Sequence, residues 1–340
     1  MIKKIFKIIF IVLIILLLIA AIITGVFAYN KMKKINYTPI DESKIEITPS
    51  VKENTTIANF RNIAILGVDS RIDTYDSEGS RSDCIIIASL NSATNEVKFV
   101  SVYRDTYLNI EGYGLNKVNS AYSLGGPELA ISTLNTNLDL NITEFVTVNF
   151  FSTIKMVDAV NGVNITLDSD EIKYINPYIN HINSLTDGYN AENIYNSGTY
   201  LLNGKQALAY SRIRYTEGWD YKRQERIKNV MLKVFDKVKT MSTSELNTFA
   251  DNMLGEISTN ISSSEIIGML PKLTSFKITN DVGFPYNIEP YDTTGLWYGV
   301  PVDLTANVSR LHKELFGVEN YVVSNKVKEI SDMITEDTGI

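Results

Sequence analysis

The sequence is poor in two residue types that carry much of enzyme chemistry. Its 340 residues include one cysteine, Cys84, and two histidines, His181 and His312. A single cysteine excludes an internal disulfide and a cysteine-based metal site. The two histidines lie in unrelated contexts, which gives little support to a histidine metal cluster or a Ser-His-Asp triad. The apolar run around Cys84, "DCIIIASL", predicts that this thiol is a buried strand residue.

The chain also lacks the loops that mark several enzyme classes, and it is short of positive charge. Neither a Walker-type loop nor a G-x-S-x-G turn is present. The formal net charge is −7, although the segment 210–228 holds six basic and three acidic residues. A local basic patch on an acidic chain argues against a general nucleic-acid binder, so no nucleic-acid partner is expected.

A single long apolar run lies near the N-terminus. Between Lys7 and Lys31 there are 23 residues without a charge, enough to cross a bilayer core of ~30 Å at ~1.5 Å per residue. We predict a short cytoplasmic tail at 1–7 and a transmembrane helix at 8–30. A cleaved signal peptide stays open as an alternative, because the last part of the run contains small residues. Lysines flank both ends, so the positive-inside rule favours neither orientation.

The rest of the chain alternates between two patterns. Residues 31–60 are polar, contain two prolines and predict a tether. Short apolar runs rich in β-branched residues predict buried strands at 62–68, 84–90, 97–102 and 145–150. Helical spacing of apolar residues predicts helices at 125–138, 152–160, 204–211 and 223–239. This alternation indicates an α/β layered fold, and the absence of a repeat or linker indicates one domain at 61–340.

Acidic residues and arginines stand together at the ends of the first three predicted strands. The pairs are Asp69 with Arg71, Arg81 with Asp83, and Arg104 with Asp105. Strand ends that meet at one edge of an α/β sheet are where sites assemble. Arg81 and Asp83 are expected on one face, because side chains alternate along a strand. An aspartate in the position of Asp69, taken on its own, is more often a turn or cap residue than a ligand.

The arginines are concentrated in one further segment. The chain has nine, and four of them lie within 15 residues: Arg212, Arg214, Arg223 and Arg226. A guanidinium matches a phosphate with two parallel hydrogen bonds, and a pair of aspartates suits Mg²⁺ that also binds phosphate oxygens. The combination predicts a site for pyrophosphate with a bridging metal. The alternative is a solvated helix face on which these arginines pair with Glu217, Asp220 and Glu225.

Five motifs occur in a fixed order: "NIAILGVDSR", "RSDCIIIASLN", "VSVYRDTYLNI", "LNKVNSAYSLGGPELA" and "YLLNGKQALAYSRIRYTEGWDYKRQERI". Together they resemble the LytR-CpsA-Psr family over residues 61–235, and the preceding apolar span fits the layout of that family. The resemblance implies an α/β/α sandwich with a central mixed sheet, anchored in the cell membrane by the single helix, with 31–60 and 61–340 outside the cytoplasm. It implies transfer of a phosphate-linked glycopolymer, such as teichoic acid or capsule, from a polyprenyl pyrophosphate carrier to peptidoglycan.

The resemblance also implies roles for individual residues. Asp69 and Asp83 are expected to bind Mg²⁺, with Mn²⁺ as a substitute, and Arg104 is expected to be catalytic beside them. Seven basic residues are expected around the pyrophosphate: Arg81, Arg104, Lys117, Arg212, Arg214, Arg223 and Arg226. An apolar groove for the polyprenyl chain is implied as well. Candidates for its lining, each of which ordinary core packing would also explain, are Leu129, Ile131, Leu134, Leu138, Val146, Val148 and Phe150.

Two positions depart from the family pattern, and both concern the acceptor side. Ile227 stands where a glutamine is common, and Trp219 separates a glycine and an aspartate that more often adjoin. Two other classes of function stay open. One is a non-catalytic sensor or scaffold that binds the lipid pyrophosphate, and the other is a pyrophosphatase or phosphodiesterase that uses water. The pair Asp69 and Asp83 weighs against the sensor, since binding alone would not need it.

Overall fold

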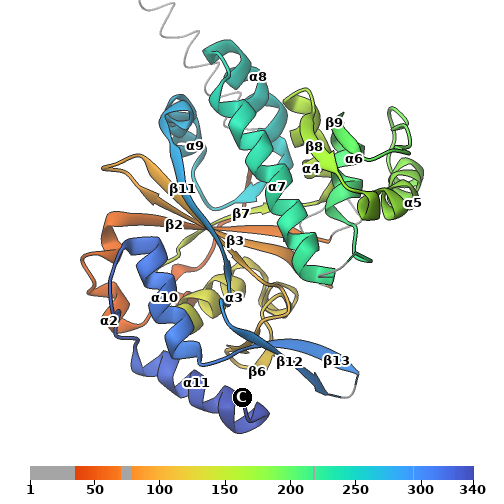
Figure 1. Ribbon diagram of the computed structural model, residues 1–340. Coiled ribbons are helices and arrows are strands. Elements are labelled where there is room, and N and C mark those ends of the chain that lie inside the picture. The colour runs from red at the N-terminus through yellow and green to blue at the C-terminus, as the bar shows by residue number, and fades with distance from the viewer. Residues whose placement is uncertain (1–34, 70–78, 217–218, 294) are drawn as a thin grey trace, which may run out of the picture.

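The structure is a computed structural model that describes residues 35–69, 79–216, 219–293 and 295–340 (Figure 1). The predicted transmembrane helix at 8–30 and Arg71 lie outside the described residues. Within the described ranges, no helix has the length and apolar character needed to cross a membrane. The anchor therefore stays a prediction from the sequence.

The centre of the fold is a mixed sheet of seven strands. In spatial order they are β1 (Asn36–Tyr37), β10 (Ser258–Thr259), β7 (Glu144–Val148), β2 (Phe60–Val68), β3 (Ser82–Asn91), β4 (Glu96–Val102) and β11 (Lys277–Phe284). β2 runs parallel to β7 and antiparallel to β3, which is antiparallel to β4. All four predicted strands are present. The last of them ends at Val148, because Asn149 caps the next helix.

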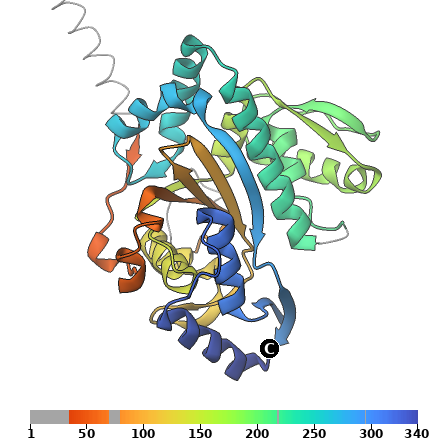
Figure 2. The ribbon, with the colours of Figure 1, turned by 60° about the vertical axis from the view of Figure 1, so that its left-hand side comes forward.

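Helices cover both faces of this sheet (Figures 1 and 2). One face carries α3 (Ser120–Leu138), α10 (Leu304–Phe316) and α11 (Asn325–Thr338). The other carries α4 (Phe150–Ala159), α7 (Trp219–Lys239) and α8 (Thr243–Met253). A lateral lobe holds α5 (Ser169–Leu185), α6 (Gly204–Ser211) and the hairpin of β8 (Val163–Leu167) with β9 (Gly198–Leu202). The expected α/β architecture with a central mixed sheet is confirmed.

Smaller elements complete the fold. They are α2 (Pro49–Lys52), α9 (Ser263–Met269), the hairpins β5 (Tyr107–Ile110) with β6 (Gly114–Lys117) and β12 (Ile288–Thr293) with β13 (Leu296–Pro301), and the 3₁₀ turns η1 (Glu42–Lys44), η2 (Ile57–Asn59), η3 (Leu254–Glu256) and η4 (Leu270–Ser275). The segment from residue 35 to 60, predicted as part of a tether, packs on the domain. Ile45, Val51 and Ile57 are buried in its core, so the folded unit begins before residue 61.

The two faces of the sheet are packed differently. Alternation along β2 sends Ala64 and Leu66 into a large buried cluster with α3, α10 and α11. Ile65 and Gly67 face the other way, toward α7. The buried cluster around α7 joins that helix to α4, α5 and α6, and among the described residues it contains none from the main sheet. The sheet therefore packs fully against α3 and incompletely against α7.

Candidate active site at one edge of the sheet

The acidic and basic residues predicted at strand ends lie at one edge of the sheet. β2 ends at Val68, which pairs with Ser82 at the start of the antiparallel β3. The last residue of β4, Val102, pairs with Ile85 of β3. Asp69, Asp83 and Arg104 are therefore neighbours, as the strand pattern predicted.

The backbone of β3 is irregular at Asp83. Gly67 pairs with Cys84, but the next residue, Val68, pairs with Ser82, so Asp83 is an extra residue opposite no partner. Such a bulge shifts the alternation of side chains. Asp83 and Cys84 consequently line the same cavity on the α7 face, whereas simple alternation would place them on opposite faces. Gly67 allows this approach, because a Cβ there would lie 2.8 Å from the Cβ of Cys84.

Asp83 is the centre of an ion-pair cluster. One oxygen accepts a hydrogen bond from Nη1 of Arg104, and the other lies 2.8 Å from Nη2 of Arg223 and 3.7 Å from Nη2 of Arg214. We call these four residues the Asp83 cluster. Burial of the carboxyl would raise its pKa, but the guanidiniums of Arg223 and Arg104 outweigh this and hold the pKa of Asp83 below its ordinary value.

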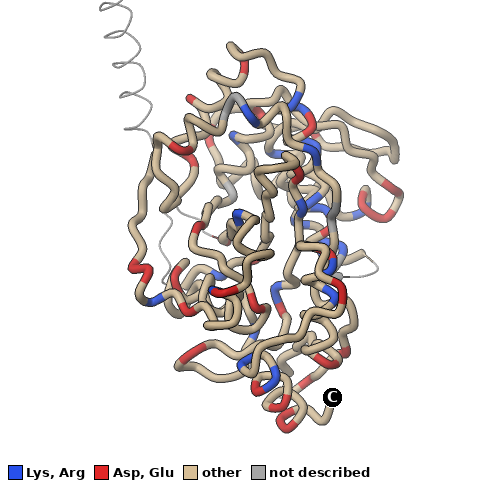
Figure 3. The backbone as a smooth tube through the Cα atoms, turned by 90° about the vertical axis from the view of Figure 1, so that its left-hand side faces the viewer, with Lys and Arg blue, Asp and Glu red and all other residues tan. Residues whose placement is uncertain are grey.

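Two further contacts extend the Asp83 cluster. Asp105 accepts a hydrogen bond from Nε of Arg104 at 3.1 Å and from Nζ of Lys117 at 2.7 Å. Asp69 adjoins Asp83 through the backbone, because the N–H groups of both donate to the carbonyl oxygen of Arg81, at 3.2 and 3.1 Å. Figure 3 shows many of the basic residues along one side of the view and others elsewhere on the chain, while acidic residues are spread over the whole chain.

The remaining predicted pyrophosphate ligands take different positions. Arg212 is half-buried and lines a cavity, and burial lowers its pKa while the nearby Asp69 counteracts this. The side chain of Arg81 is exposed. Arg226 is buried apart from the Asp83 cluster and donates to Glu171 at 2.8 Å, to the carbonyl of Ile213 and to Thr216. These contacts favour a role for Arg226 in holding the loop that carries Arg212 and Arg214.

An apolar cavity opens beside the Asp83 cluster. It lies between the sheet and α7, with Ile65 and Cys84 on one side and Met231 on the other, and has an empty volume of about 690 Å³ including space open to solvent. Arg212 and Arg223 join Asp83 in its lining. Burial raises the pKa of the Cys84 thiol to about 12, so this cysteine is an apolar wall residue.

A second apolar cavity adjoins the first. Ile65, Met156 and Met231 line both, and the second has an empty volume of about 750 Å³ measured in the same way. It reaches Phe249 of α8 and Leu273 of η4. We call the two together the lipid cavity, because the sequence led us to expect an apolar groove for a polyprenyl chain. Arg212 and Arg223 are among its lining residues, whereas Arg104 and Arg214 are not.

The lipid cavity lies on the opposite side of the sheet from most of the residues predicted to line it. Ile131, Leu134 and Leu138 of α3 are buried in the packed core, with at most 1% of their surface exposed, and Leu129 packs against the same core. Their assignment to the groove was wrong, because apolar composition does not distinguish a packed face from an open one. Val148 does line the cavity.

One residue of the cavity was not singled out by the sequence. Asn149 caps α4 through Oδ1, which accepts hydrogen bonds from the backbone N–H and the hydroxyl of Ser152. Its amide nitrogen is buried and has no partner among the described residues, although Asn149 lines the cavity beside Arg212. A hydrogen bond to a ligand oxygen would remove the free-energy cost of leaving this buried donor unpaired. The only signal in the sequence was an asparagine between a strand and a helix.

The two aspartates fit a magnesium ion. Oδ1 of Asp69 is buried and accepts no hydrogen bond from the described residues. Both oxygens of Asp83 contact guanidiniums, so a metal there would share this carboxylate. In the part of the chain that the structure describes, no group of three or more His, Cys, Asp or Glu side chains could hold a metal. Mg²⁺ commonly uses one or two carboxylates together with water and phosphate oxygens, which matches this pair.

Comparisons with known proteins agree on one family. The LytR_cpsA_psr family model matches residues 22–305. The polyisoprenyl-teichoic acid–peptidoglycan teichoic acid transferase TagT of Bacillus subtilis is 30% identical over 70% of this chain and 70% of its own length. TagU of Enterococcus faecalis, with the same descriptive name, is 31% identical over 75% and 80%. A solved structure of TagT with bound octaprenyl pyrophosphate has a TM-score of 0.53 at 22% identity, covering 85% of this chain and 94% of its own.

Proposed function

This chain belongs to the LytR-CpsA-Psr family, and on that premise we propose that it transfers a cell-wall glycopolymer from a polyprenyl pyrophosphate carrier to peptidoglycan. The polymer is of the teichoic acid or capsule class and is linked to its carrier through a phosphate. The predicted helix at 8–30 holds the catalytic domain on the outer side of the cytoplasmic membrane. That position confines the enzyme to the surface where a lipid-linked donor lies, which raises the effective concentration of donor.

The observation that carries this proposal is that the lipid cavity lies directly beside the arginines of the Asp83 cluster. Arg223 and Asp83, which form an ion pair, both line the lipid cavity. A polyprenyl pyrophosphate is long and apolar at one end and doubly anionic at the other, so it needs both environments side by side. The relative TagT has been solved with bound octaprenyl pyrophosphate. We assign the lipid cavity of the present protein to a polyprenyl chain of the same class.

The arginines bind and orient the pyrophosphate. Guanidiniums of Arg104, Arg214 and Arg223 converge on one carboxylate, and their donors can reach phosphate oxygens that approach Asp83. Asn149 adds a neutral donor from the end of α4. The bond between the acceptor hydroxyl oxygen and the phosphorus of the glycopolymer forms as the bond to the lipid phosphate breaks, and the hydroxyl proton is released to solvent. Positive charge on the guanidiniums stabilises the charge on the leaving lipid phosphate.

Asp69 and Asp83 would hold Mg²⁺. When bound, the ion supplies positive charge to the oxygens of the pyrophosphate. Asp69 would contribute the carboxylate oxygen that has no hydrogen-bond partner among the described residues, and Asp83, whose oxygens contact the arginines, would be the second carboxylate. Mn²⁺ meets the same oxygen ligands and is expected to substitute.

A transfer assay tests the proposal. The full chain in detergent is incubated with a polyprenyl-pyrophosphate-linked glycopolymer, with and without peptidoglycan. We expect polymer bound covalently to peptidoglycan, lipid monophosphate in equal amount, and little consumption of donor when the acceptor is omitted. Equal release of lipid phosphate without acceptor would identify a hydrolase. Donor binding without any turnover would identify a sensor or scaffold.

A further inference from the structure

Asp105 is a buried carboxylate that holds one cation on each of its two oxygens. Oδ2 accepts a hydrogen bond from Nε of Arg104 at 3.1 Å, and Oδ1 accepts one from Nζ of Lys117 at 2.7 Å. Only 4% of the surface of Asp105 is exposed. Arg104 and Lys117 are both expected at the pyrophosphate, whereas Asp105 has no role assigned there. A single carboxylate therefore connects two of the expected ligands.

The contacts of Asp105 differ from those of Asp69, which we assign to the metal. Oδ1 of Asp69 is buried and accepts no hydrogen bond from the described residues. Each oxygen of Asp105 already accepts a hydrogen bond from a cation. A metal ion at Asp105 would have to displace one of these cations. Asp105 is therefore better suited to hold ligands of the pyrophosphate than to bind the metal itself.

The backbone on both sides of this carboxylate is tied to distant parts of the chain. The carbonyl oxygen of Arg104 accepts a hydrogen bond from the N–H of Asn119, before α3, at 3.2 Å. The carbonyl oxygen of Asp105 accepts one from the N–H of Gly299, in β13, at 2.9 Å. Thr106 forms a β-bridge with the same glycine. Asp105 is consequently a fixed point against which mobile side chains can be ordered.

Lys117 is held from a second side by an aromatic ring. Its Nζ lies 5.3 Å from the centroid of the Tyr298 ring, within the range of a cation–π contact. Tyr298 packs in turn against Tyr107, with 4.8 Å between the ring centroids. A lysine on its flexible stem loses conformational entropy when a ligand fixes it. A lysine that the protein has already fixed loses less, so pre-organisation favours binding of the phosphate.

Asp105 also offsets the repulsion between two neighbouring cations. Arg104 and Lys117 contact the same carboxylate, so their positive charges lie close together before any ligand binds. Like charges repel at such distances, and the negative charge between them lowers this cost. Arg104 is in addition held at two points, because its Nη1 donates to Asp83 and its Nε donates to Asp105. Two acceptors on different strand ends fix the plane of the guanidinium.

We propose that Asp105 is a positioning residue of the pyrophosphate site, which orders Arg104 and Lys117 and contacts neither the pyrophosphate nor the metal. This inference rests on the proposed function and adds to it the residue that orders two of its ligands. It predicts the sign of one effect. A negative charge beside an anion site repels the anion, so its removal alone would strengthen binding. Loss of a carboxylate that orders the cations weakens binding instead.

Calorimetry with inorganic pyrophosphate, without metal, measures this sign on the full chain in detergent. Asp105→Asn should weaken pyrophosphate binding about tenfold, because hydrogen bonds to charged groups are lost. Asp158→Asn is the matched control, since Asp158 accepts hydrogen bonds from two neutral groups, the N–H of Gly204 at 2.7 Å and the hydroxyl of Tyr189 at 2.9 Å. Its affinity should equal that of wild type. Unchanged or tighter binding in Asp105→Asn would overturn the proposal.

Removal of the two cations should reverse the sign. In the double variant Arg104→Ala, Lys117→Met the carboxylate has lost the cations that it orders, and its charge only repels the anion. The further change Asp105→Asn should then tighten pyrophosphate binding about 2- to 5-fold. A weakening as large as in the wild-type background would show that Asp105 acts independently of Arg104 and Lys117, which would refute the positioning role.

Turnover shows whether the positioning matters for catalysis. Asp105→Asn should lower kcat for transfer about 10- to 100-fold, since a displacement of ~1 Å can cost that much, while urea denaturation checks that the variant is folded. Asp105→Glu keeps the charge but moves the carboxylate by one methylene group, so its kcat and affinity should be intermediate.

The remaining outcomes separate this inference from the proposed function. If Asp105→Asn does not fold, wild-type kcat and pyrophosphate affinity in Asp105→Glu would overturn the positioning role, because a displaced carboxylate would then order the cations equally well. Weakened pyrophosphate binding in Asp105→Asn, in a chain whose wild type transfers nothing, would uphold the positioning role and refute the transferase.

Discussion

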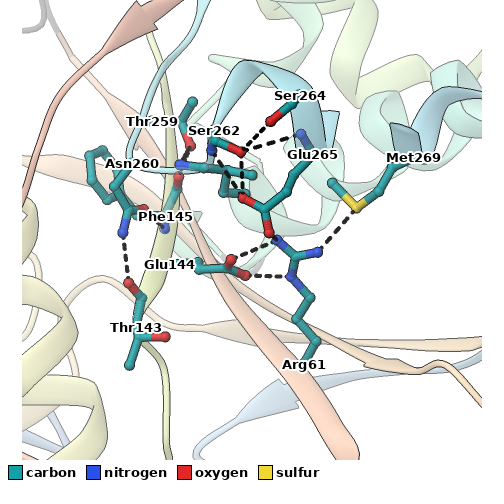
Figure 4. Close-up of polar contacts among 11 residues, drawn as sticks. Arg61, Thr143, Glu144, Phe145, Thr259, Asn260, Ser262, Ser264, Glu265 and Met269 are labelled. Atoms are coloured by element: carbon teal, nitrogen blue, oxygen red, sulfur yellow. Dashed lines mark hydrogen bonds and ion pairs between the residues drawn. The ribbon is translucent and has the colours of Figure 1, made fainter. Parts of the chain in front are cut away.

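Clusters of arginine and carboxylate lie at both ends of β2, and they differ in composition. At the end of the strand is the Asp83 cluster, where guanidiniums of Arg104, Arg214 and Arg223 contact one carboxylate. At its beginning Arg61 meets two carboxylates, Glu144 and Glu265, which we call the Arg61 cluster (Figure 4). The same residue types thus occur in opposite proportions.

The surroundings of the two clusters differ as well. Arg61 forms a forked pair with Glu144, at 2.6 Å for each hydrogen bond, and Sδ of Met269 lies 3.5 Å from its third nitrogen. Its fork is filled by protein groups that join β2 to β7 and α9. The Asp83 cluster instead borders the lipid cavity, which Asp83 and Arg223 help to line. A ligand-binding arginine site is therefore recognised by several guanidiniums that converge beside a cavity. A single arginine paired with carboxylates indicates a structural role.

The largest expected difference between the clusters is in catalysis. Arg104→Lys should lower the transfer rate by about 10³-fold or more, nearly as much as Arg104→Ala, because an ammonium supplies charge without the two parallel donors of a guanidinium. The rate of glycopolymer transfer to peptidoglycan measures this effect. The matched variant Arg61→Lys should transfer at close to the wild-type rate. A transfer rate above a tenth of wild type in Arg104→Lys would show that charge alone suffices at the Asp83 cluster.

The next expected difference is in stability. Asp83→Asn removes the carboxylate that the guanidiniums of Arg104 and Arg223 contact, and loss of one partner of a buried ion pair costs about 3–5 kcal/mol. Glu144→Gln, in the more exposed Arg61 cluster, should cost about 1 kcal/mol. Urea denaturation of both variants measures the free energies of unfolding. Equal losses in the two variants would contradict the distinction between the clusters.

The stability difference for Asp83→Asn should also depend on pH. The folded-state pKa of Asp83 lies below its ordinary value of 3.8. The carboxylate therefore contributes fully above pH 3.8, and its contribution is lost as the pH falls through the folded-state pKa. Denaturation curves of wild type and Asp83→Asn should converge at low pH. A difference that stays constant down to pH ~2 would mean that the charge of Asp83 is not what stabilises the cluster.

The sequence predicted the fold and the edge of the sheet on which the site lies. Strands such as β2 and β3 were predictable because short apolar runs rich in β-branched residues are typical of buried strands. The strand ends then place Asp69, Asp83 and Arg104 together without further information. The bulge at Asp83 was not predictable, since it depends on the approach of Gly67 to a residue of the neighbouring strand. It decides which face the carboxylate occupies.

Two further features could not be predicted from the sequence. One is which residues distant in sequence form ion pairs, and the other is whether a face of the sheet is closely packed or leaves a cavity. Arg226 belongs to the same basic segment as Arg223, yet it pairs with Glu171, 55 positions away. Apolar character likewise does not distinguish a core residue from a cavity residue, because Leu134 and Met231 are both apolar. Only the packing shows that Leu134 is enclosed by core residues and that Met231 lines a cavity.

A smaller effect is expected from filling the cavity. Met231 lines both parts of the lipid cavity, so Met231→Trp should obstruct their junction. Octaprenyl pyrophosphate should bind about tenfold more weakly, while inorganic pyrophosphate should bind as before, because the arginines are unchanged. Calorimetry with both compounds measures this. Met269→Trp, a change of the same kind beside Arg61, should leave both affinities intact. Unchanged octaprenyl pyrophosphate affinity in Met231→Trp would exclude this space as the lipid site.

The smallest effect is expected at the edge of the Arg61 cluster. Glu265 lies 3.6 Å from Arg61, with 51% of its side chain exposed, and Arg61 is already bound by Glu144. Glu265 also accepts hydrogen bonds from Ser262 at the start of α9, a role that glutamine can fill. Glu265→Gln therefore removes only the charge and should cost less than about 0.5 kcal/mol in urea denaturation, with less still at high salt. A loss above about 1 kcal/mol that persists in salt would show that both carboxylates, and not the fork with Glu144 alone, hold Arg61 in place.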